Sequence, residues 1–197
     1  MRTDAPTDLV ERAFTATREQ VDATRPAHLT LSTPCPAWDV RTLVNHIIGG
    51  AYWYAEAMRD GVSPPIEGDD DDYVAGDFGT AYAEGIRQAL AAFAAPGALD
   101  TTVTFVGRPV PATTVLRLCA LDTFVHGWDL ARALGRSTDL DPQLADVLRE
   151  HAAPRLPDSF RGTDDDALYR PPVAAPPDAT AADHLAAALG RSVTSDP

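Results

Sequence analysis

Residues 114–134 read TVLRLCALDTFVHGWDLARAL, and this stretch predicts a long helix inside a helical core. Its apolar residues recur at spacings of three and four, as on one face of an amphipathic helix, and Gly135 follows as a C-cap. Asp122 interrupts the apolar stripe, and His126 stands one turn later on the same face. A carboxylate left unpaired there would cost on the order of a few kcal/mol, so a hydrogen-bond donor, a cation or a metal must lie nearby.

Three further helices are expected before this one. The first is predicted at 8–25, with Thr7 as its candidate cap and a proline directly after it. The second, at 40–59, follows Asp39, which is a good N-cap residue. The third is predicted at 74–94 from aromatic and aliphatic residues at helical spacing. Together with the stretch quoted above, these helices indicate a four-helix core.

The remaining elements are shorter. Residues 101–110 are rich in β-branched side chains on both sides of Gly107, which favours a short β-hairpin before the fourth helix. Helices are expected at 142–155 and at 181–189. Between them, residues 157–178 are rich in proline and aspartate, and we expect an extended surface segment there.

Length, composition and charge limit the domain organisation, the partners and the location that the chain can have. The 197 residues, 45% of them hydrophobic, suit one four-helix unit at 1–140 and a helical extension at 141–197 that packs on it. A net charge of −13 argues against nucleic acid and anionic membrane as partners. The sequence has no apolar run approaching the roughly 20 residues of a membrane span, and its N-terminus lacks the apolar core of a signal peptide. A cytoplasmic protein is therefore expected.

The two cysteines, Cys35 and Cys119, are far apart in sequence, and we expect both to be free thiols. Cys119 lies on the apolar stripe of the fourth helix, where a buried thiol is expected. Cys35 stands between two prolines, either as a packed loop residue or as a thiol near the functional site.

A second histidine, His46, lies close to the buried stripe of the helix at 40–59. Two imidazoles and a carboxylate that point into a helix bundle can hold a divalent metal and leave coordination positions open. The alternative is a structural Asp122–His126 pair, or a partner for Asp122 such as Arg117 or Arg132. Only the metal hypothesis requires His46 to meet Asp122 and His126.

Two long motifs resemble a known family. Residues 33–46, TPCPAWDVRTLVNH, resemble the opening motif of the DinB-like metal-binding bundles, in the branch related to the N-terminal domain of mycothiol-dependent maleylpyruvate isomerase. Residues 122–133, DTFVHGWDLARA, look like the second motif of that branch, and 189–191, LGR, resemble its usual ending. The resemblance implies a mainly all-α, DinB-like four-helix bundle in a cytoplasmic bacterial protein. It also implies a metal held by His46, Asp122 and His126, and the use of a low-molecular-weight thiol.

The chain departs from the isomerase in two respects. The isomerase has glutamate where this chain has Asp122, whose shorter reach changes the geometry or the metal. The isomerase also has a further C-terminal domain that contributes to its substrate site, and the residues after Gly135 are too few for it. The substrate of the isomerase is therefore not transferred to this chain.

The expected cofactor is Zn²⁺, with Ni²⁺ or Fe²⁺ as alternatives, and mycothiol is a candidate cosubstrate. Asp129 is expected either to orient a metal ligand or to pair with Arg132, and Trp128 either to pack beside the ligands or to fill the core. No catalytic residue is assigned. The expected activity is thiol-dependent transfer or isomerisation of a small molecule, with hydrolysis as its enzymatic rival. A non-catalytic metal-binding or ligand-sensing bundle is the alternative. In either case the expected assembly is a homodimer.

Overall fold

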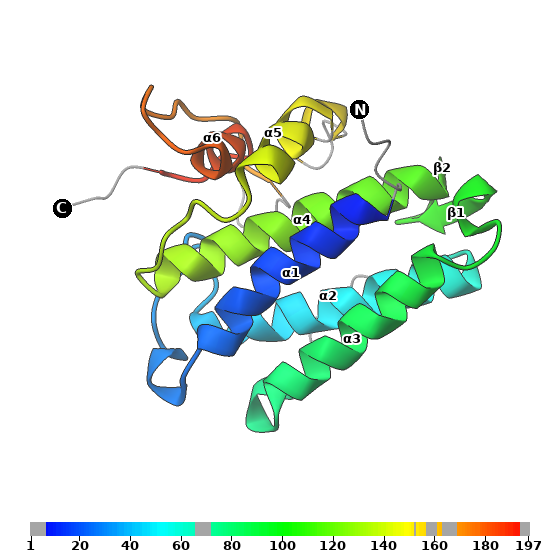
Figure 1. Cartoon of the computed structure of the whole chain (residues 1–197), viewed down its shortest axis with the longest axis horizontal. Helices are drawn as coiled ribbons and strands as arrows, with labels where there is room; N and C mark the ends of the chain where they lie inside the picture. Colours follow the sequence, from blue (N-terminus) through cyan, green and yellow to red (C-terminus); the bar gives the residue numbers. More distant parts are fainter. Residues whose placement is uncertain (1–6, 66–71, 152, 157–160, 163–168, 194–197) are drawn as a thin grey trace.

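The computed structural model describes residues 7–65, 72–151, 153–156, 161–162 and 169–193. Four long helices form the larger part of the molecule: α1 (Asp8–Ala23), α2 (Val40–Asp60), α3 (Phe78–Phe93) and α4 (Ala112–Ala133). Helix α1 packs on α4 and α3, and α2 packs on α3 and α4 (Figure 1). The mainly helical fold with a hairpin before the fourth helix is confirmed.

The core lies among these helices, and its largest fully buried side chains are aromatic and aliphatic, as the predicted apolar stripes require: Phe14, Leu43, Ile48, Tyr82, Phe93, Leu121, Phe124 and Trp128. Gly127 allows α4 to approach α1 closely, because a Cβ atom there would lie 2.3 Å from the hydroxyl oxygen of Thr17. That hydroxyl donates a hydrogen bond of 2.8 Å to the carbonyl of Thr123. The contact fixes the part of α4 that carries Asp122 and His126.

The first and second helices begin where predicted, at residues 8 and 40, whereas the Thr7 cap and the start of the third helix at residue 74 are wrong. Asp39 caps α2 by accepting a hydrogen bond of 2.9 Å from the Thr42 amide, as expected. Thr7 makes no side-chain cap, because its own backbone is already helical and not extended as a capping residue requires. Helix α3 begins at Phe78 and not at residue 74, because the Asp77 carboxylate accepts the Thr80 amide at 3.0 Å and starts the helix there.

The hairpin consists of β1 (Thr102–Phe105) and β2 (Arg108–Pro111), which pair antiparallel directly before α4. Its two-residue turn is Val106–Gly107, and both residues have positive φ, 49° and 74°. That is the geometry of the type I′ turn, whose twist matches the twist of the strands.

The C-terminal part contains α5 (Pro142–His151) and α6 (Ala181–Ala188), which pack on each other and on α4 (Figure 1). Helix α5 ends at His151, and a 3₁₀ turn at Ala153–Arg155 follows, so the predicted end at 155 was too late. Part of the predicted surface segment 157–178 lies outside the described residues. Within the described part Tyr169 is only 6% exposed, so the expectation of a surface position was wrong for this residue.

None of the helices in the described ranges has the length and apolar character needed to cross a membrane. Both cysteines are free; Cys119 is buried, as expected, and Cys35 is partly exposed.

Candidate metal centre

Three side chains from two helices meet beside the middle of α4. His46 comes from α2, and Asp122 and His126 come from adjacent turns of α4. One ligand atom from each lies within 4.8 Å of the other two, and His126 Nε2 is 3.5 Å from Asp122 Oδ1. The structure therefore brings together the three residues that the sequence pattern singled out.

This donor set fits a divalent transition metal. Bonds of about 2.0–2.2 Å to imidazole nitrogen and carboxylate oxygen place neighbouring donor atoms roughly 3–3.5 Å apart. The separation of 3.5 Å between His126 and Asp122 needs little adjustment to reach that range. The Asp122 side chain is 27% exposed and that of His126 is 9% exposed, so the site can be reached from the side of Asp122.

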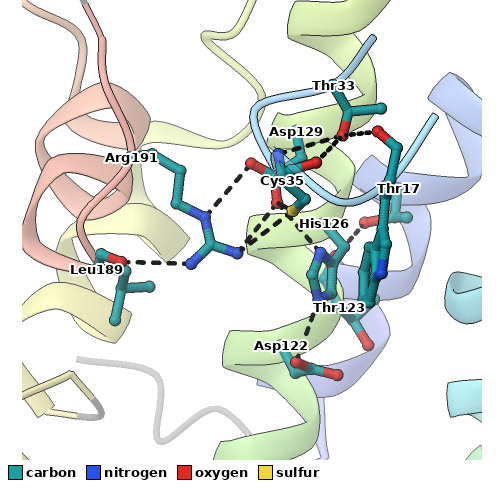
Figure 2. A network of polar contacts seen from close by, with 10 residues as sticks. Thr17, Thr33, Cys35, Asp122, Thr123, His126, Asp129, Leu189 and Arg191 are labelled. Carbon is teal, nitrogen blue, oxygen red and sulfur yellow. Dashed lines mark hydrogen bonds and ion pairs between the residues drawn. The ribbon is translucent and has the colours of Figure 1, made fainter. Parts of the chain in front are cut away.

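A buried carboxylate orients the His126 ring. Asp129 is fully buried, and its Oδ2 lies 3.1 Å from His126 Nδ1 (Figure 2). This contact assigns Nδ1 to the hydrogen bond and leaves Nε2 facing Asp122. Histidines that bind metals are held in the same way, with a carboxylate on the nitrogen that does not touch the ion.

Asp129 pairs with Arg191 and not with Arg132, so that alternative was wrong. Arg191 Nη2 lies 3.1 Å from Asp129 Oδ2, and Arg191 Nε lies 3.4 Å from Asp129 Oδ1. Arg132 instead donates to the Val193 carbonyl at 3.2 Å. The sequence pattern does not indicate this role of Arg191, although the LGR ending to which it belongs resembles a family pattern.

The loop between α1 and α2 adds Cys35 and Trp38 to the site. The Cys35 thiol lies 3.3 Å from Asp129 Oδ2, so of the two expectations for this residue the thiol near the site was correct. The Trp38 ring lies 4.5 Å from the His46 ring and 5.6 Å from the His126 ring, measured between centroids. Trp38 therefore covers both imidazoles and restricts the access of water from that side.

Trp128 faces away from the imidazoles. It is fully buried, and its indole N–H donates to Asp183 Oδ1 of α6 at 2.8 Å. This contact agrees with the second expectation for Trp128, a residue that fills the core between α4 and the C-terminal part.

The charged groups at the site shift one another's pKa values. Burial alone would lower the pKa of His126, but its hydrogen bonds with Asp122 and Asp129 raise the pKa well above its usual value. Burial would raise the pKa of Asp122, yet the hydrogen bond and charge of His126 lower it overall. Burial likewise opposes the charge on Asp129, and Arg191 with His126 still brings that pKa down to about 2. A metal must therefore compete with a proton for His126.

A second set of potential donors, Cys35, His126 and Asp129, also has one ligand atom per residue within 4.8 Å of the others. It suits a cation less well, because both oxygens of Asp129 already accept hydrogen bonds from the guanidinium of Arg191. In the set of His46, Asp122 and His126 the carboxylate instead faces an imidazole, with His126 Nε2 3.5 Å from Asp122 Oδ1.

Comparison with known proteins agrees with the resemblance seen in the two motifs. The family described as mycothiol maleylpyruvate isomerase N-terminal domain matches residues 10–131, which include all three candidate ligands. Two relatives described as uncharacterized proteins, from the CDC 1551 and H37Rv strains of Mycobacterium tuberculosis, are each 34% identical over 163 residues. These alignments cover 82% of this chain and 84% of each relative. No solved structure gave a significant match. The chain belongs to the family of the mycothiol maleylpyruvate isomerase N-terminal domain.

Proposed function

We propose that this protein binds one divalent transition metal through His46, Asp122 and His126, with Zn²⁺ as the first choice and Ni²⁺ or Fe²⁺ as alternatives. The observation that carries the proposal is the convergence of these side chains from two helices to within 4.8 Å. A structural Asp122–His126 pair alone would not require an imidazole from α2 at the same point. Three protein ligands leave coordination positions for a small molecule.

The finer proposal is a thiol-dependent transferase or isomerase, with mycothiol as the candidate cosubstrate. Membership of the family supports the thiol, and the exposed side of Asp122 offers a way in. A divalent ion in such a site acts as a Lewis acid and lowers the pKa of a coordinated thiol or water. The protein's own contribution is to hold His126 in one orientation through Asp129 and to keep water off the imidazoles with Trp38. Hydrolysis uses the same residues and is the enzymatic rival.

The alternative is a non-catalytic metal-binding or ligand-sensing protein. The environment of one further carboxylate favours it: Asp129 is fully buried and bonded to both Arg191 and His126. A carboxylate held in this way is not offered to a substrate as a general base. Turnover of a small molecule with a thiol cosubstrate, lost in His46→Ala, distinguishes the enzyme from the binder.

The proposal also includes a cytoplasmic location and a small-molecule or thiol partner, with no nucleic acid and no membrane as partner. The net charge of −13 supports this exclusion, because phosphate-rich surfaces repel such a protein. We also propose a unit at 1–140 with an extension at 141–197, which limited proteolysis tests. Light scattering tests the proposed homodimer.

The metal proposal is tested with untagged protein that is stripped of metal and then titrated with Zn²⁺ in a calorimeter. We expect one ion per chain. Zn²⁺ at 100 times its Kd should also stabilise the folded protein by about 2.7 kcal/mol, which a rise in melting temperature detects. His46→Ala should abolish binding, whereas the matched variant His184→Ala, a half-buried helix histidine of α6, should leave it unchanged. A wild-type protein that takes up no ion and keeps its melting temperature with Zn²⁺ and Ni²⁺ would reject the proposal.

A further inference from the structure

Two side chains of the C-terminal part reach the candidate metal centre. They are Tyr169 and Arg191, and both are at least nine-tenths buried, at 6% and 8% exposure. The family match ends at residue 131, so both lie outside the matched part of the chain. We refer to residues 169–193 below as the C-terminal segment.

The backbone turn at the end of α6 places Arg191. The Gly190 amide donates to the Ala187 carbonyl and the Arg191 amide to the Ala186 carbonyl, both at 3.0 Å. Gly190 has a φ of 85°, and these two bonds make a Schellman motif, the common left-handed end of a helix. The chain therefore leaves α6 in a fixed direction that points the side chain of Arg191 toward α4, as Figure 2 shows.

Arg191 completes a chain of contacts that ends on a candidate ligand. Its guanidinium bonds both oxygens of Asp129, and Asp129 in turn bonds Nδ1 of His126. Asp129 has no exposed surface, so Arg191 supplies the charge that keeps a carboxylate there. Without Arg191, Asp129 would lose the partner that fixes its position against the imidazole.

Tyr169 makes the corresponding contact on the second candidate ligand of α4. The guanidinium carbon of Arg191 lies over its ring, 5.6 Å from the ring centroid. Its buried hydroxyl lies near the Asp122 carboxylate, whose negative charge adds to burial in raising the pKa of Tyr169. The two residues thus pack on each other, and Arg191 bonds the carboxylate that supports His126 while Tyr169 lies near Asp122 itself.

We propose that the C-terminal segment positions the metal ligands, Arg191 by fixing His126 through Asp129 and Tyr169 by fixing Asp122, so that metal binding and docking of the segment stabilise each other. The inference rests on the proposed metal binding and adds two residues that hold its ligands in position. Such coupling is reciprocal: whatever the docked segment adds to metal affinity, the metal adds to the stability of docking.

The first test measures Zn²⁺ affinity by competition with a chelator in Arg191→Met and Tyr169→Phe. Loss of such supporting contacts weakens metal binding by about 10- to 100-fold, and we expect both variants to show at least the lower value. Arg132→Met is the matched control, because Arg132 also bonds the C-terminal segment, at the Val193 carbonyl, but does not contact Asp129. Its affinity should stay within about threefold of wild type.

The second test measures amide hydrogen exchange at residues 181–193 in the wild-type protein with and without Zn²⁺. We expect the ion to slow exchange there, because it stabilises the docked segment. Because it uses the wild-type protein, this measurement tests the role of the C-terminal segment even if Arg191→Met does not fold. Tyr169→Phe removes only a hydroxyl, so this variant should fold.

Two outcomes overturn the inference in distinguishable ways. The role of the C-terminal segment alone is overturned if the wild-type protein binds Zn²⁺ and both Tyr169→Phe and folded Arg191→Met bind it with wild-type affinity. It is also overturned if Zn²⁺ binds but leaves hydrogen exchange at residues 181–193 unchanged. A wild-type protein that binds no metal overturns the proposed function, and this inference with it.

Discussion

Gly190→Ala should destabilise the protein far more than the equivalent change at the end of α4. An alanine at 190 would have to adopt a φ of 85°, and left-handed backbone costs an L-residue about 1–2 kcal/mol. Its Cβ would also lie 2.5 Å from Arg170 Cβ and 2.7 Å from the Arg170 carbonyl oxygen. Because backbone atoms cannot move aside as a flexible side chain can, we add about 1–3 kcal/mol for overpacking. The sum is about 2–5 kcal/mol.

Gly135 provides the matched control. It follows α4 with a φ of 65° and is part of the same kind of helix end, with the Arg136 amide bonded to the Ala131 carbonyl at 2.9 Å. A Cβ at 135 would meet nothing within 4 Å, so Gly135→Ala should cost only the strain of about 1–2 kcal/mol.

The assay is urea unfolding of both variants and wild type without metal at 25 °C, followed by Zn²⁺ titration. We expect Gly190→Ala to lose more stability than Gly135→Ala by about 1–3 kcal/mol, and to bind Zn²⁺ more weakly because Arg191 is displaced from Asp129. Equal losses in the two variants, or full metal affinity in Gly190→Ala, would refute the reasoning that this turn places Arg191.

Three further predictions concern other parts of the structure. Gly127→Ala should destabilise the protein by about 1–3 kcal/mol, because its Cβ would meet Thr17. Gly50→Ala, whose Cβ would have nothing within 4 Å, should be neutral or stabilise the protein by up to about 1 kcal/mol. Urea unfolding measures both changes, and a change of the same sign in the two variants would contradict the close approach of α1 and α4. Asp141→Asn should cost about 1 kcal/mol at neutral pH, because hydrogen bonds from Arg12 and the Leu144 amide outweigh burial and lower the pKa of Asp141. A lowered pKa stabilises the folded state at pH values above the unfolded pKa of about 3.9, and this stabilisation is lost as the pH falls through the folded pKa. The difference in free energy of unfolding between Asp141→Asn and wild type should therefore shrink in acid. An unchanged difference at pH 3 would contradict this prediction. Cys35→Ser should leave Zn²⁺ affinity within about threefold of wild type, since Cys35 does not belong to the preferred donor set, and a larger loss in the chelator assay would favour the set with Asp129.

The parts of the fold and site that depend on local spacing could be predicted from the sequence. Asp122 and His126 share a face of α4 because they are four residues apart, and His46 follows the apolar stripe of α2. The direction of Trp128 was available in the same geometry: two residues after His126 correspond to about 200° around a helix, so it had to face away from the imidazoles. The start of α3 was also available, because Asp77 stands three residues before Thr80 in a capping arrangement.

The parts that depend on tertiary packing could not be predicted. Arg132 is three residues from Asp129 and was a reasonable partner, but Arg191, 62 residues away in sequence, makes the pair. Its position follows from the turn at Gly190 and from the packing of α6 on α4, and neither shows in the spacing of the residues. Tyr169 was missed for the same reason: it lies in a proline-rich stretch that reads as surface, yet its ring is buried under Arg191.

The most direct test of the metal centre is anomalous X-ray scattering at the zinc absorption edge from crystals of the untagged protein reconstituted with Zn²⁺. We predict one anomalous peak, about 2.0–2.2 Å from one donor atom each of His46, Asp122 and His126. A map with no peak at these residues, or with the ion bound by Cys35 and Asp129 while His46 points elsewhere, would contradict it.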